Sequence, residues 1–322
     1  MSTRTPNGFR ALADGLASAL QWRLLLLWTL GLLIPTLVAI LPLWRALAAR
    51  IDQSTMASDL AARFHLTSLL EAVMPVFRDS GASLLGGGLS ALLLTLLLSP
   101  WLSGMVVTSI RAGQTLNFGH LLQGGLREYG RMLRMLLWAV IPLGVLAGVG
   151  SLPMGWADRQ AEHAVLEVTA DNARTVAMVV LAVLLVFGHA TVEAGRAVIA
   201  ADPARRSVVK AWWQGLRLVL RRPLAIAIVY VGSMLPGYAI ALGLGAARTQ
   251  LNAGTAFGLI AGLVVVQLAV AAVAWARASR LYGLGELARG EQDRQVRQVQ
   301  VAVASQHGAS VPATDVAETT AG

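Results

Sequence analysis

Few polar residues interrupt the long apolar runs of this chain, and three of those that do are close neighbours. His189, Glu193 and Arg196 are spaced by four and three residues at the end of one uncharged run. On a helix this spacing places the three side chains on one face. Ionisable residues inside membrane-spanning segments are costly and rare, so they are functional candidates by default.

Two interpretations of this group are open. The carboxylate and the imidazole could relay a proton or an ion, which normally requires a polar partner on another helix. Gln267, near the middle of a later apolar run, is the only other strongly polar residue at depth, although it could equally be a hydrogen-bonding contact between helices. In the structural interpretation, which we favour, Glu193 neutralises Arg196 near the membrane interface. The ligand or relay candidates are therefore His189, Glu193, Arg196 and Gln267.

Other chemistries lack the residues that they need. The chain has no cysteine, which excludes disulfides and thiolate nucleophiles. Its five histidines are scattered without metal-ligand spacing, and there is no phosphate-binding glycine loop, no nucleophile elbow and no pair of catalytic carboxylates. We therefore expect no catalytic residues, no metal and no cofactor.

The composition indicates the elements that hold these residues. The chain is 56% hydrophobic and 13% charged, whereas soluble domains carry about 25% charged residues. A helix needs about 20 apolar residues to cross a bilayer. Six uncharged runs are near or above that length, and they predict an all-α integral membrane protein with six transmembrane helices at 24–44, 80–110, 135–157, 175–192, 223–247 and 249–276.

The distribution of basic residues predicts the orientation. Of the 26 lysine and arginine residues, about three quarters lie in the N-terminal segment, the second and fourth loops and the C-terminal segment. Basic residues concentrate in cytoplasmic loops, so both termini are predicted to be cytoplasmic. Because no basic face with interleaved aromatic residues occurs elsewhere, we expect no nucleic-acid partner.

A repeated segment precedes the first, third and fifth spans. In each copy a Gly-Leu pair, at Gly15, Gly125 or Gly215, follows a large apolar residue by three positions. Two copies share paired arginines, which we predict to lie at the membrane surface: Arg127, Arg131, Arg217 and Arg221.

We interpret each copy as an amphipathic cytoplasmic surface helix, separate from the span that follows, with residues such as Leu121 and Trp212 facing lipid. The predicted six-helix membrane domain covers 1–290 and contains three repeat units, about 8–110, 117–201 and 207–286. A disordered cytoplasmic tail is predicted at 291–322. The alternative is that basic residues and a common Gly-Leu pair coincide by chance.

The segment from Ile110 to Pro142 and its copy from Ala200 to Tyr230 carry a family resemblance. The chain resembles the uncharacterised six-span inner-membrane proteins of bacteria, a group that includes the YciC-like family and the membrane domain of some glycerophosphodiester phosphodiesterases. The resemblance covers most of residues 8–290 and is one of architecture. It implies a multi-pass protein of the bacterial inner membrane, and it carries no residue roles.

These observations predict a non-enzymatic membrane protein that binds or passes a small or lipidic ligand, or organises a membrane partner through its surface helices. The expected partners are membrane lipids, with a membrane-protein partner left open. One alternative is a proton-coupled secondary transporter that uses His189, Glu193 and Gln267 at the bundle centre. Another is a membrane-embedded lipid-modifying enzyme. Convergence of those three side chains on one cavity would favour the transporter.

Overall fold

The computed structural model describes residues 7–51, 66–163, 167–251 and 255–308, and the regular structure in these ranges is helical. Six of the helices are long and apolar enough to cross a membrane, as the sequence predicted for a multi-pass membrane protein. The elements in chain order are α1 (Gly8–Ser18), α2 (Trp22–Ile51), α4 (Leu66–Ala112), α5 (Phe118–His163), α6 (Glu167–Ala201), α7 (Val208–Arg221), α8 (Pro223–Thr249) and α9 (Ala256–Gly308).

Local sequence explains where several helices begin and end. The side chain of Ser207 caps α7 by accepting a hydrogen bond from the Lys210 amide, which satisfies a donor that the first turn leaves free. Pro223 begins α8, where a missing amide hydrogen costs nothing. Gly113 ends α4 with φ of 63°, a conformation that glycine adopts readily.

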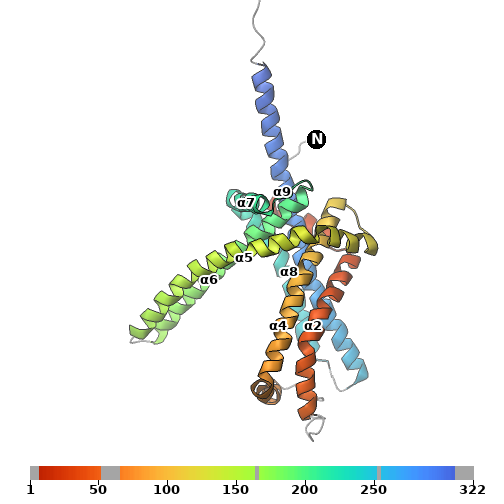
Figure 1. The fold of residues 1–322 in the computed structure, drawn as a ribbon, viewed down its shortest axis with the longest axis vertical. Helices are drawn as coiled ribbons and strands as arrows, with labels where there is room; N and C mark the ends of the chain where they lie inside the picture. Colours follow the sequence, from red (N-terminus) through yellow and green to blue (C-terminus); the bar gives the residue numbers. More distant parts are fainter. Residues whose placement is uncertain (1–6, 52–65, 164–166, 252–254, 309–322) are drawn as a thin grey trace, which may run out of the picture.

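The spanning helices form three neighbouring pairs that meet at one end of the molecule. Figure 1 shows the α5–α6 pair leaning away from α2 and α4, with the fainter α8 and part of α9 behind those two helices. The short helices α1 and α7 lie at the end where the pairs meet, and α9 continues past them. We call this end the hub. It is built on residues 102–110 of α4, 188–200 of α6 and 274–288 of α9, which contain most of the buried side chains of these helices.

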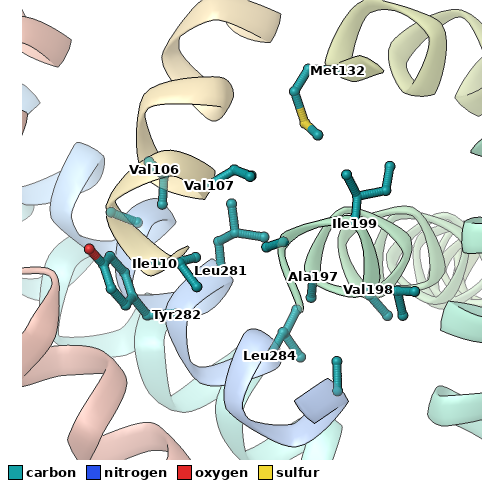
Figure 2. Packing of buried hydrophobic residues seen from close by; sticks show 14 of the residues in the cluster. Val106, Val107, Ile110, Met132, Ala197, Val198, Ile199, Leu281, Tyr282 and Leu284 are labelled. Carbon is teal, nitrogen blue, oxygen red and sulfur yellow. The ribbon is translucent and has the colours of Figure 1, made fainter. Parts of the chain in front are cut away.

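Aliphatic side chains from α4, α6 and α9 fill the hub. Figure 2 shows Val106 and Ile110 facing Leu281 and Leu284, with Ile199 close by. All five side chains are at most 4% exposed. The hub is therefore packed like the core of a protein, and it fixes the ends of all three pairs relative to one another.

Arginines join the helix ends within the hub. Arg111, at the end of α4, donates to the carbonyl oxygens of Ile199 (2.7 Å) and Ala200 (3.2 Å) at the end of α6. Arg289 of α9 donates in the same way to the carbonyl oxygen of Ile110 at 2.8 Å. The last carbonyls of a helix lack partners within it, so a guanidinium placed there satisfies them and complements the helix dipole.

The three repeated glycines occupy comparable crossings in the hub. A methyl group on Gly15 would lie 2.9 Å from the amide nitrogen of Gly283 on α9, and one on Gly215 would collide with the backbone of Gly195 on α6. A methyl group on Gly104 of α4 would lie 2.8 Å from the carbonyl oxygen of Gly125. Each repeated segment therefore crosses one of the helices α4, α6 and α9 at a pair of glycines, where the two backbones approach closely.

The predicted separation of surface helix from span holds for two of the three segments. Helices α1 and α7 are distinct short helices, but the segment around Gly125 is the first part of α5 and continues without a break into the third span. Residues 130–134 contain no proline, and Gly130, which could have ended the helix, keeps a helical conformation.

Two further expectations need correction. Leu121 is fully buried, and Trp212 donates a hydrogen bond to Thr191 of α6. The apolar faces that we assigned to lipid therefore pack against the spanning helices. The tail predicted to be disordered from residue 291 continues α9 through Gly308. Glutamine, arginine and alanine are good helix formers, and they extend the helix although it buries little there. Residues 309–322 lie outside the described part of the chain.

Candidate functional site

A cavity of about 510 Å³ lies beside the hub at the centre of the bundle. This volume falls within the range of small-molecule sites. All six spanning helices contribute to its wall. One lining residue from each helix, in chain order, is Trp28, Val106, Leu143, Glu193, Tyr230 and Arg280.

Among the described residues, Glu193 of α6 is the only carboxylate that lines the cavity, and its side chain is 6% exposed. Arg196, one turn further along α6, donates to its Oε1 at 2.5 Å. Arg280 of α9 places Nε 3.6 Å from Oε2 of the same carboxylate. A buried carboxylate requires such partners, and here one glutamate ties α6 to α9.

His189 and Tyr230 join α6 to α8 at the same level. His189 Nδ1 and the Tyr230 hydroxyl share a hydrogen bond of 2.8 Å, and His189 Nε2 lies 4.0 Å from Glu193 Oε1. The guanidinium carbon of Arg280 lies 4.9 Å from the centre of the Tyr230 ring, within the range of a cation–π contact. One polar cluster therefore links α6, α8 and α9.

The cavity wall carries an excess of positive charge. Arg196, Arg277 and Arg280 line it, against the single carboxylate of Glu193. The Nε atoms of Arg196 and Arg280 are buried without a hydrogen-bond partner in the described structure. Arg277 has an exposed side chain and makes no ion pair or hydrogen bond with the described residues. The wall thus presents more donors and more positive charge than the protein itself satisfies.

The charged part of the cavity lies near the hub end of the spans. Arg277 and Arg280 follow the start of α9 at Ala256 by more than 20 residues, which is over 30 Å at ~1.5 Å per residue. This length matches the thickness of the hydrocarbon core of a bilayer. The arginines therefore lie about one hydrocarbon thickness along α9 from its start, towards the end of the molecule that holds α1 and α7.

The structure brings together three of the four predicted relay candidates. His189, Glu193 and Arg196 line the cavity. Gln267 instead lines a separate hollow of about 360 Å³ between α2, α4 and α9, and it makes no hydrogen bond with the described residues. The set required for the predicted relay therefore does not converge on one cavity.

The four predicted surface arginines lie outside the cavity, on the first part of α5 and on α7. Arg127 and Arg217 are exposed, and Arg217 lies over the ring of Trp213 at 5.7 Å. Arg131 lies 3.5 Å from Glu128, and Arg221 lies 3.3 Å from Glu291 of α9. Two of these arginines therefore pair with carboxylates of α5 and α9.

Sequence reasoning missed Arg277, Arg280 and Tyr230. We ended the sixth apolar run at Arg277 and counted both arginines only as basic residues beyond a span. Their spacing of three residues, directly after an apolar run, was the available signal, because it puts them on one helix face. Nothing in the sequence indicates that this face meets Glu193.

Metal binding finds no support among the described residues, where no group of three or more histidine, aspartate or glutamate side chains could hold an ion. Comparison of the chain with protein-family models, with curated proteins and with solved structures finds no match. The functional argument therefore rests on the cavity.

Proposed function

We propose that this chain is a multi-pass membrane protein that binds, or passes, an anionic ligand of small or lipidic type in its central cavity. The observation that carries the proposal is the cavity lined by all six spans, with three arginines against one carboxylate. Guanidinium groups recognise phosphate and carboxylate groups well, because their donors form a planar fork. A site of this charge favours an anion over a cation or a neutral solute.

The wider setting belongs to the same proposal. The orientation with both termini in the cytoplasm is supported by the distribution of basic residues. The three-unit architecture is supported by the glycine crossings at Gly15, Gly125 and Gly215. The bacterial inner membrane and the likeness to YciC-like proteins are supported only by the repeated segments.

Proton-coupled transport has weaker support. His189 and Glu193 do line the cavity, but Glu193 already has two arginine partners, and Gln267 lies in a different hollow. A coupling carboxylate must exchange partners between states. Glu193 is better suited to holding Arg280 and Arg196 in place at the cavity wall.

The test is binding of phosphatidylglycerol to the detergent-purified protein, measured by native mass spectrometry. Replacing Arg277→Gln should weaken binding about tenfold or more, because a charge-assisted hydrogen bond contributes about 1.5–3 kcal/mol. Arg277 has no ion pair to lose, so folding should be unaffected. The matched control is Arg134→Gln, which removes an exposed arginine of α5 that does not line the cavity. Equal weakening in the two variants, or in neither, would contradict the proposal.

A further inference from the structure

An apolar groove continues from the arginine cavity towards the far end of the spans. Its volume is about 460 Å³, and α2, α8 and α9 form most of its wall. Leu32 lies on α2, Ala241 and Leu244 lie on α8, and Val266, Ala269 and Val273 lie on α9. The only ionisable groups that line it are Arg277 at the hub end and Arg248 near the end of α8. Between these two arginines the groove offers almost no hydrogen-bonding group.

The groove and the cavity meet at two shared residues. Trp28 and Arg277 line both. The indole nitrogen of Trp28 donates to the carbonyl oxygen of Leu102 at 3.2 Å, which holds the ring in place. Arg277, by contrast, makes no ion pair or hydrogen bond with any described residue. A cation that has no partner among the described residues therefore lies where the polar cavity opens into the apolar groove.

The groove has the length of one lipid leaflet. Its lining on α9 extends from Arg277 to Val265, which is about 18 Å along the helix at ~1.5 Å per residue. Half of the ~30 Å hydrocarbon core is about 15 Å. The hollow that contains Gln267 shares Leu32, Thr95, Val266 and Val270 with the groove and widens it towards α4.

We infer that the ligand of the cavity is an anionic membrane lipid, with its headgroup at Arg277 and Arg280 and an acyl chain in the groove between α2, α8 and α9. This inference rests on the proposed function and names its ligand class. Charge complementarity selects an anionic headgroup, since the cavity holds three arginines against one carboxylate. The apolar walls and leaflet length of the groove select an acyl chain over a second polar group. The lipid comes from the leaflet on the side of α1 and α7, because the arginines lie at that end of the spans.

The test compares two phosphatidylglycerols that differ only in chain length, dihexanoyl and dioleoyl, on the detergent-purified full chain. Ala241→Trp fills the groove at a position that does not line the arginine cavity. It should weaken dioleoyl binding about tenfold and leave dihexanoyl binding within about twofold. Ala239→Trp is the matched control, because Ala239 is exposed on the same helix and lines neither the arginine cavity nor the groove. Ala269→Trp places the same block on α9 and serves if the α8 variant does not fold.

The outcomes separate this inference from the function beneath it. If Arg277→Gln weakens both lipids while both groove variants bind dioleoyl phosphatidylglycerol normally, the groove assignment is overturned and the anion site stands. If Arg277→Gln weakens neither lipid, the proposed function fails as well. Equal weakening by Ala241→Trp and Ala239→Trp would also overturn the inference, because the effect would not depend on the groove.

Discussion

The two ends of the spanning helices differ sharply in what surrounds them. At the hub, Leu102, Ile199 and Leu284 are at most 2% exposed and pack against residues from other helices. Beyond it the same helices carry large apolar side chains that are half exposed or more, including Leu37 (58%), Leu89 (61%), Val145 (60%), Val183 (61%), Leu242 (74%) and Leu263 (61%). One end of the spanning helices is therefore surrounded by protein, and the other end is expected to be surrounded by lipid.

This difference locates the stability and the binding of the molecule. The crossings at Gly15, Gly125 and Gly215, the ion pair of Glu193 with Arg280 and the cap of α6 by Arg111 gather at the hub, so the three helix pairs are fixed there. The far ends make fewer contacts between pairs and can leave room between them. The central cavity lies at the boundary, with its arginines anchored on the hub side and its apolar groove reaching into the lipid-facing side.

The largest loss of stability is expected from Glu193→Gln. The change removes the charge that compensates Arg196 and Arg280 at a site where the carboxylate is 6% exposed. Breaking a buried ion pair by removing one partner costs about 3–5 kcal/mol. Unfolding in mixed micelles of a mild detergent and dodecyl sulfate would measure this change in free energy.

The matched control for Glu193→Gln is Glu286→Gln, also on a span that enters the hub. Glu286 is 41% exposed, and its ion pair within the described part of the chain is with Arg289, at 2.7 Å. Exposed pairs contribute about 0–1 kcal/mol. A Glu193→Gln variant as stable as the Glu286→Gln variant would show that the cluster is not a structural link, and it would reopen a functional role for Glu193.

A smaller loss is expected from Gly215→Ala at the crossing of α7 and α6. The added methyl group would collide with the amide nitrogen of Gly195 and lie 2.8 Å from its Cα. Because backbone rather than a flexible side chain is in the way, the helices must move apart, which costs about 1–3 kcal/mol. The same unfolding measurement applies.

Gly144→Ala on α5 is the control for the crossing, because a methyl group there meets nothing within 4 Å. Alanine has the higher helix propensity, so this change should be neutral or stabilise by up to about 1 kcal/mol. The two substitutions should therefore differ in sign. Comparable losses from Gly15→Ala and Gly125→Ala would extend the result to all three crossings, whereas a loss confined to Gly215→Ala would argue against an equivalent role for the three segments.

Features that depend on residues close together in the sequence could be predicted from it. The number of spans follows from uncharged runs, and the contact between Glu193 and Arg196 follows from their spacing on one helix. The ends of the spans were harder to predict, because a helix does not stop where the hydrocarbon stops. The first span continues to Ile51 and the sixth to Gly308.

Contacts between distant elements could not be read from the sequence. Arg280 belongs to the last helix, and only the packing of α9 against α6 brings it to Glu193. Leu121 and Trp212 were assigned to lipid because an amphipathic helix beside a membrane normally turns its apolar face there. In this fold that face meets another helix instead, since glycines on both partners allow close approach. Periodicity identifies an apolar face but not its neighbour.

The smallest effect is expected from Gln267→Leu, in the lipid-facing part of the bundle. The amide lines the hollow between α2, α4 and α9 and makes no hydrogen bond with the described residues. Leucine has a similar size and removes an unpaired polar group from apolar surroundings, so the free energy of unfolding should change by less than about 0.5 kcal/mol or rise slightly. Phosphatidylglycerol binding should also be unchanged, because Gln267 lines neither the arginine cavity nor the groove assigned to the acyl chain. A relay through His189, Glu193 and Gln267 requires the opposite result. If the Gln267→Leu variant kept its stability but lost proton-coupled uptake into vesicles, the hollow that contains Gln267 and the arginine cavity would have to act together. The transporter interpretation would then replace the one proposed above.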